Sequence, residues 1–168
     1  MAETIIETLP PGTRLALRAA PEPAARLSGA FGVVLPPPLL TAAHGGKRAA
    51  LRLGPDDILL LAEEGAAASL LQALAAVPGA GPVSLTDISH GQIALRITGP
   101  QAGELLNEGC PLDLDPATFP PGACTRTLFG KAGIVLWRTG AAVFHVEVAR
   151  SFAPYLRALL DEAAADLA

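Results

Sequence analysis

The sequence predicts an α+β domain made of two internally duplicated β-α-β-β-α units of the split βαβ, ferredoxin-like kind. Three observations predict it. The expected strands and helices occur twice in the same order, their apolar residues have the period of a strand or of a helix, and short sequence matches recur at fixed offsets. We expect one domain over 1–168, with repeat units at about 13–82 and 83–168.

The first unit is expected to begin with a strand at 13–19, whose leucines alternate with arginine and alanine. Prolines open a weak helix at 21–32, and a glycine closes it. Two strands within 47–65 surround the turn residues 54–57, where a proline presets φ and two aspartates bond back to the backbone. A helix at 66–77 places its leucines on one side.

The second unit repeats this order. A strand over 83–89 leads into it, and the remaining strand, short helix, hairpin and long helix are expected at 91–99, 100–109, 134–148 and 151–168. Ser151 is the expected N-cap of the last helix. Pro154 falls in its first turn, where the missing N–H costs little.

Sequence matches at two offsets favour the duplication. Shifted by 78 residues, LALR at 15–18 falls on IALR at 93–96, and shifted by 86, Gly54 falls on Gly140. Short matches arise easily in a chain rich in alanine and leucine. The shared order of elements therefore carries more weight.

Composition excludes several classes of protein. Hydrophobic residues make up 51% and charged residues 17%, which is too apolar for a disordered chain. A net charge of −4 argues against a nucleic-acid partner. No apolar run reaches the roughly 20 residues of a membrane helix, and the acidic N-terminus lacks the features of a secretory signal. Cys110 and Cys124 are too few for a disulfide framework, so we expect a cytoplasmic protein with reduced thiols.

The stretch TDISHGQIAL brings Asp87, Ser89 and His90 within four residues. A hydrolytic triad needs its histidine beside the serine, but neighbouring side chains of a strand point to opposite faces. A Gly-x-Ser-x-Gly elbow is also missing. We therefore expect Asp87 and Ser89 to bond to the backbone at a strand bend, with His90 at a surface or interface. A small hydrolase remains the weakest alternative.

Metal and phosphate motifs are not found. His44, His90 and His145 are far apart in sequence, and the two cysteines are fourteen residues apart. Gly46-Lys47 lacks the other residues of a phosphate loop, and PGAGP has a proline where a dinucleotide loop needs a helix start. We expect no metal, flavin or nicotinamide site in this chain.

The stretch Asn107–Lys131 contains four prolines and little helical periodicity. So long a connection is functional, covered by a partner, or a rigid crossover over the sheet. Interface and plain crossover are equally favoured by the residues. Trp137, inside a strand, is the first choice for the core. The candidate interface residues are Asp87, Ser89, His90, Cys110, Pro111, Phe119, Pro120, Pro121, Phe152 and Tyr155.

Several segments together resemble the gamma subunit of heterotetrameric sarcosine oxidase. They are GCPLDL at 109–114, FPPGACTRTL at 119–128 followed by a lysine, and RSFAPYL at 150–156. The resemblance covers roughly Val83–Ala164 well, and LGPDDILLL at 53–61 fits a glycine-proline-acid turn of the family. The first 47 residues match only by the order of their elements.

The resemblance implies a fold related to the folate-binding domain of glycine-cleavage aminomethyltransferase. It also implies an accessory subunit without a catalytic site, in a complex that converts sarcosine to glycine, hydrogen peroxide and methylene-tetrahydrofolate. FAD, FMN, NAD and tetrahydrofolate would then belong to the alpha, beta and delta subunits. A stand-alone folate- or pterin-binding module is the main alternative.

Overall fold

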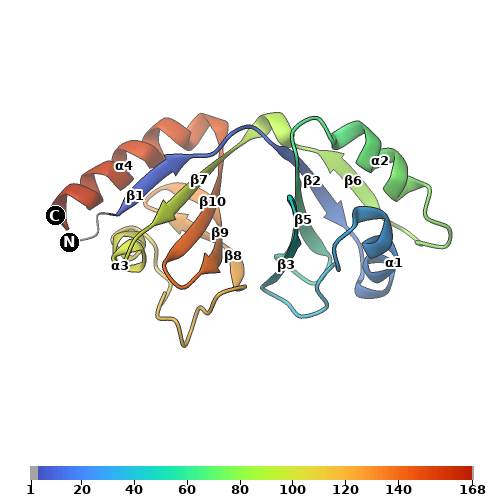
Figure 1. Ribbon diagram of the computed structural model, residues 1–168, viewed down its shortest axis with the longest axis horizontal. Coiled ribbons are helices and arrows are strands. Elements are labelled where there is room, and N and C mark those ends of the chain that lie inside the picture. Colours follow the sequence, from blue (N-terminus) through green and yellow to red (C-terminus); the bar gives the residue numbers. More distant parts are fainter. Residues whose placement is uncertain (1–3, 168) are drawn as a thin grey trace. The chain divides into compact units, whose positions relative to one another are not determined.

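The computed structural model describes residues 4–167, which form two compact units. One unit is Pro11–Ser89, and the other joins the N-terminal strand to the chain from His90 onward. Each unit has a five-stranded antiparallel sheet with two helices (Figure 1). The α+β class is confirmed. The repeat boundaries at 13–82 and 83–168 stay a prediction.

The sheet of the Pro11–Ser89 unit has the strand order β3-β4-β5-β2-β6. Its strands are β2 (Thr13–Arg18), β3 (Thr41–Gly45), β4 (Arg48–Arg52), β5 (Asp57–Ala62) and β6 (Ser84–Asp87). Helices α1 (Pro21–Phe31) and α2 (Ala67–Ala75) pack on one face of this sheet. Leu15 and Leu17 from β2 meet Phe31 of α1 and Leu74 of α2 there, all fully buried. The alternation of the strand and the period of the helices thus supply the two sides of one core.

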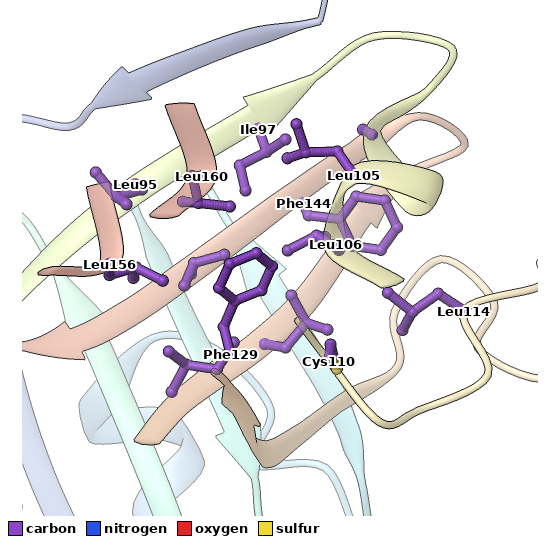
Figure 2. Packing of buried hydrophobic residues seen from close by; sticks show 14 of the residues in the cluster. Leu95, Ile97, Leu105, Leu106, Cys110, Leu114, Phe129, Phe144, Leu156 and Leu160 are labelled. Carbon is purple, nitrogen blue, oxygen red and sulfur yellow. The ribbon is translucent and has the colours of Figure 1, made fainter. Parts of the chain in front are cut away.

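The sheet of the other unit has the order β1-β7-β10-β9-β8. Its strands are β1 (Ile5–Thr8), β7 (Gln92–Thr98), β8 (Cys124–Phe129), β9 (Ala132–Gly140) and β10 (Val143–Ala149). Helices α3 (Ala102–Asn107) and α4 (Ala153–Asp166) cover one face, and the short 3-10 turn η2 (Arg150–Phe152) precedes α4. Figure 2 shows Phe129 and Phe144 of the sheet packed among leucines such as Leu106 and Leu156 of these helices.

The two sheets correspond strand for strand. Strands β3, β4, β5, β2 and β6 of one sheet correspond in order to β8, β9, β10, β7 and β1 of the other. In both sheets the first two strands form a hairpin at one edge, and a strand of four residues forms the opposite edge. Each short edge strand precedes the other unit: β1 leads into β2 but pairs with β7, and β6 leads into β7 but pairs with β2. These correspondences support the predicted duplication, which stays a prediction.

Three strands were not expected from the sequence: β1, β3 and β8. β3 reads TAAHG, and alanine has little strand preference, so its pairing with β4 is what makes it a strand. β8 lies inside the proline-rich stretch 107–131, which the sequence predicts to be a connection without strands. All four prolines of that stretch precede Cys124, so the connection ends where β8 begins.

The predicted N-cap of α4 was wrong. Ser151 lies in η2, and the N-cap residue is Phe152, which makes no side-chain capping bond. The 3-10 turn has moved the start of the helix along the chain. Pro154 does lie in the first turn of α4, as expected.

Candidate functional site

Asp87 and Ser89 hydrogen-bond to each other at the C-terminal end of β6. The Ser89 N–H donates to Asp87 Oδ1 at 2.9 Å, and the Ser89 hydroxyl lies 2.5 Å from the same oxygen. That hydroxyl also accepts the backbone N–H of Arg14 at 2.9 Å. The predicted bonding to the backbone at a strand bend is confirmed. The Ser89 hydroxyl and Asp87 Oδ1 are both engaged in this bend, so these contacts are those of a strand end.

His90 lies in the 3-10 turn η1 (Ser89–Gly91), with its side chain exposed. Its carbonyl oxygen accepts a hydrogen bond from Arg150 Nε at 2.8 Å. This bond joins the turn before β7 to the turn before α4. His90 therefore belongs to a surface feature of the second unit, as one of the two expectations had it.

The proline-rich connection from Glu108 to Ala123 is held by hydrogen bonds from Arg138, a buried residue that is 4% exposed. Arg138 Nη1 donates to the carbonyl oxygens of Leu114 and Phe119, each at 3.0 Å. Its Nη2 donates to the carbonyl of Ala141 in the β9–β10 turn. The guanidinium carbon also lies 4.9 Å from the ring centroid of Phe144. One buried side chain thus ties the connection, a hairpin turn and the core together.

Arg52 of β4 does the same in the Pro11–Ser89 unit. It is 1% exposed, and its Nε donates to the carbonyl of Pro36 in the connection between α1 and β3. Its Nη1 donates to the carbonyl of Pro55 in the β4–β5 turn at 2.8 Å. The shift of 86 residues that aligns two glycines also places Arg52 on Arg138 and Pro55 on Ala141. Neither arginine lies in a recognisable motif, and the 86-residue offset is the signal in the sequence that relates them.

Two of the predicted interface residues lie in the core instead. Cys110 is 5% and Phe119 8% exposed, and both pack in the cluster that includes Leu114. Their side chains are covered by the unit itself and are not available to a partner. Three prolines of the connection, Pro111, Pro120 and Pro121, are exposed. Trp137 is 8% exposed, as expected of a buried residue.

Phe152 and Tyr155 are the two predicted residues with large exposed apolar side chains, at 43% and 39%. Their rings meet edge to face, with centroids 6.3 Å apart and planes at 85°. Tyr155 Oη accepts the backbone N–H of Lys131 at 3.1 Å. The start of α4 is thereby joined to the β8–β9 turn, and two aromatic rings are held on the surface.

Comparison with known proteins shows the family of this chain. A model of the sarcosine oxidase gamma subunit family matches residues 16–166, which is most of the sequence. The chain belongs to this family.

Curated relatives agree with the assignment to the sarcosine oxidase gamma subunit family. The gamma subunit of sarcosine oxidase from Corynebacterium sp. (strain U-96) is 34% identical over 143 residues, which cover 83% of this chain and 69% of that protein. The gamma subunit from Arthrobacter sp. is 33% identical over 137 residues, covering 80% of this chain and 66% of that protein. The match thus spans about two-thirds of the length of these relatives.

Solved structures show the same relationship. A chain of the heterotetrameric sarcosine oxidase from Corynebacterium sp. U-96, in complex with pyrrole 2-carboxylate, matches with a TM-score of 0.88 and 32% identity, covering 97% of this chain and 84% of that one. The glycine-cleavage aminomethyltransferase T of Bartonella henselae matches with a TM-score of 0.70 at 13% identity, covering 95% of this chain and 45% of that one. The second likeness shows the fold alone. It confirms the expected fold and does not favour folate binding by this gamma-family chain.

Residues 4–167 of this gamma-family chain show no cluster of three His, Cys, Asp or Glu side chains able to hold a metal ion. No helix in the same range is long and apolar enough to cross a membrane. The two buried arginines Arg52 and Arg138 donate to main-chain carbonyls, whereas the buried carboxylate of Glu147 lies 2.7 Å from Nε2 of His145. The chemistry of the two arginines is that of fixing the backbone.

Neither Cys110 nor Cys124 of this gamma-family chain forms a disulfide, and both are buried. Burial raises the pKa of Cys124 to about 12, so the thiol stays protonated and unreactive at neutral pH. We expect Ellman's reagent at pH 8 to find no fast-reacting thiol in the folded protein and two after denaturation. A Leu128→Cys variant, at a position 49% exposed, serves as the reactive control. A fast native reaction of the unaltered protein would contradict this burial.

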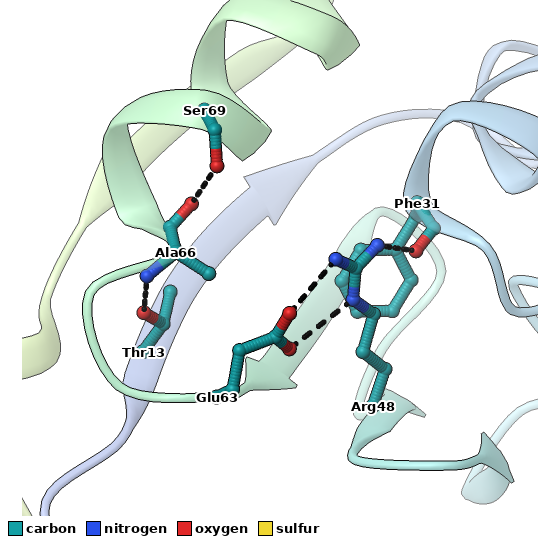
Figure 3. A network of polar contacts seen from close by, with 6 residues as sticks. All are labelled: Thr13, Phe31, Arg48, Glu63, Ala66 and Ser69. Atoms are coloured by element: carbon teal, nitrogen blue, oxygen red, sulfur yellow. Dashed lines mark hydrogen bonds and ion pairs between the residues drawn. The ribbon is translucent and has the colours of Figure 1, made fainter.

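In the Pro11–Ser89 unit, Arg48 of β4 forms an ion pair with Glu63 and also bonds to the end of α1 (Figure 3). Arg48 Nη2 and Nε donate to the two carboxylate oxygens of Glu63 at 3.0 and 3.3 Å. Arg48 Nη1 donates to the carbonyl of Phe31 at 2.7 Å. The hydrogen bonds from Arg48 lower the pKa of Glu63 to about 2 from its ordinary 4.5.

Because the pKa of Glu63 is lower in the folded state, its ionised form stabilises the fold above about pH 4.5. That stabilisation is lost as the pH falls from there toward 2. We expect Glu63→Gln to be less stable than the unaltered chain at pH 7, and the gap to narrow at pH 3. Urea unfolding of both proteins at pH 7 and pH 3 measures this difference in the free energy of unfolding. A gap of equal size at both would show that the carboxylate charge is not responsible.

Proposed function

We propose that this chain is the accessory, non-catalytic gamma subunit of a heterotetrameric sarcosine oxidase, and that it stabilises the larger subunits of that complex. The observation that carries the proposal is the match to a chain of such an oxidase over 97% of this sequence, at 32% identity. Binding that occurs only to folded partners stabilises them by mass action. The work of this subunit is therefore to bury partner surface.

The contacts within the chain fit such a role. The hydroxyl of the Asp87–Ser89 pair closes a strand end, Cys124 is kept protonated by burial, and the buried arginines hold carbonyls. These groups are thus engaged in contacts that hold the fold. The oxidative demethylation of sarcosine would then be carried out by the alpha, beta and delta subunits. FAD, FMN, NAD and tetrahydrofolate are proposed to reside there, in a cytoplasmic complex.

The test compares the larger subunits produced with and without this chain. We expect co-production to raise their yield and their melting temperature, and the purified gamma chain to release no hydrogen peroxide from sarcosine. Equal yield and melting temperature in both preparations would overturn the stabilising role. Peroxide released by the purified chain alone would overturn the non-catalytic assignment.

A further inference from the structure

We propose that a larger subunit of the complex docks on the surface formed by Phe152, Tyr155, Lys131, Arg150 and His90, here called the aromatic patch, through a segment with acidic side chains around an apolar centre. This inference rests on the proposed function and assigns it a place on the molecule. All five residues belong to the unit from His90 onward, so their mutual positions are those of one compact body.

The two aromatic rings are already held in place. Tyr155 Oη accepts the Lys131 N–H, and the Phe152 ring stands edge-on to the Tyr155 ring. Aromatic side chains with few rotatable bonds lose little entropy on binding, and they dominate the energetics of interfaces. Both rings stay about two-fifths exposed in a chain that has only 4% aromatic residues, and together they form an exposed apolar pair on this unit.

Gly130 lets the β8–β9 turn pack closely against Tyr155. Its φ is +56°, and a Cβ at this position would lie 2.6 Å from Tyr155 Oη and 2.7 Å from Leu159 Cδ2. Any side chain there would push the tyrosine away from the turn. Glycine therefore allows the hairpin turn to pack closely on Tyr155 and Leu159 of α4.

The charge around the patch is positive, in a chain whose net charge is −4. Lys131 and Arg150 are exposed, and Arg150 is oriented by its bond to the His90 carbonyl. The first turn of α4 has no acidic residue, and its free N–H groups add positive charge. No aspartate or glutamate lies within two residues of Lys131, Arg150 or His90 in sequence, and the exposed Asp87 is three residues before His90.

This combination indicates the chemistry of the partner. Exposed aromatics beside arginine are typical of interface centres, and a positive rim favours an acidic surface. A second copy of this chain would bring like charges together across a two-fold axis, which disfavours a homodimer through the patch. An acidic, apolar-centred segment of a larger subunit satisfies both parts of the surface.

The chain offers a matched control for the charges. Lys47 follows Gly46 in the β3–β4 turn, where φ is +58°, just as Lys131 follows Gly130 in the β8–β9 turn. The charge reversal Lys131→Glu/Arg150→Glu is therefore compared with Lys47→Glu/Arg26→Glu.

For the aromatic side chain, Phe152→Ala is compared with Ile5→Ala, whose residue is 60% exposed. Melting curves followed by circular dichroism check that all four variants fold. Together the two pairs separate the charged from the apolar part of the patch.

The measurement is the dissociation constant of each variant for the larger subunits, purified without the gamma chain, at low and high NaCl. We expect Phe152→Ala and the patch reversal each to weaken binding about tenfold or more, and the controls to stay within about threefold. The patch reversal should also reduce the salt dependence of binding. Binding of the patch variants equal to that of their controls would overturn the docking surface while leaving the proposed function intact.

Failure of the unaltered chain to bind would overturn the proposed function, and the inference with it. Self-association of the unaltered chain that Phe152→Ala abolishes would assign the patch to a homodimer and overturn the acidic partner. Sedimentation of the chain alone measures this.

Discussion

Replacement of Arg138 by methionine is expected to lower the free energy of unfolding by about 3–5 kcal/mol. The guanidinium is buried and donates to the carbonyls of Leu114, Phe119 and Ala141. Methionine keeps the apolar stem but leaves these oxygens without their donor in a region that water reaches poorly. It also removes the contact with the face of Phe144. The proline-rich connection should loosen, with faster amide exchange over 108–123.

Urea unfolding of the Arg138→Met variant measures the loss of stability, and hydrogen exchange locates it. Arg26→Met is the control, because Arg26 is half-exposed and its ion pair with Glu22 is worth about 1 kcal/mol or less. Arg52→Met should resemble Arg138→Met, since Arg52 holds the carbonyls of Pro36 and Pro55 in the same way. A loss for Arg138→Met no larger than that for Arg26→Met would show that the arginine does not fix the connection.

Phe129→Ala is the second large effect, with an expected loss of about 3–5 kcal/mol. The ring is fully buried and lies at the centre of the core between the sheet and the two helices (Figure 2). A Cβ on Gly109 would come within 2.9 Å of this ring, so the ring directly supports the start of the proline-rich connection. Its removal leaves a cavity that the neighbouring strands and helix cannot easily fill.

The neighbouring residue gives the matched control. Leu128 precedes Phe129 on β8, points to the other face of the strand and is 49% exposed. Leu128→Ala should cost less than about 1 kcal/mol. Chemical denaturation of both variants provides the comparison. Similar losses from the two substitutions would contradict the packing of β8.

The parts of the fold that the sequence predicted have a strong apolar period. Leu15 and Leu17 define β2 by alternation, and the leucines of α2 lie on one side of a helix. The alanines of β3 have no such signal, and only pairing with β4 makes that segment a strand. At the start of α4, Ser151 had the right residue type for a cap, but the local 3-10 turn decided where the helix begins.

The candidate site could be predicted only in part. Aromatic residues are scarce in this sequence, which makes Phe152 and Tyr155 candidates for an interface, and both are exposed on the surface. The cationic neighbours Lys131 and Arg150 come from other turns of the chain, and their proximity depends on tertiary packing. Phe119 had the same composition signal as Phe152, but the unit buries it. Residue type alone cannot distinguish an aromatic that anchors a partner from one that fills a core.

The central claim is that this chain contributes a folded surface to an oxidase whose reactive groups belong to other subunits. Native mass spectrometry of material purified from the host through a tag on this chain tests it most directly. We expect one species that holds a single copy of this chain together with three different partner chains. That species should release hydrogen peroxide from sarcosine. Recovery of the tagged chain as a monomer, with no partner and no sarcosine-oxidising activity, would contradict the account.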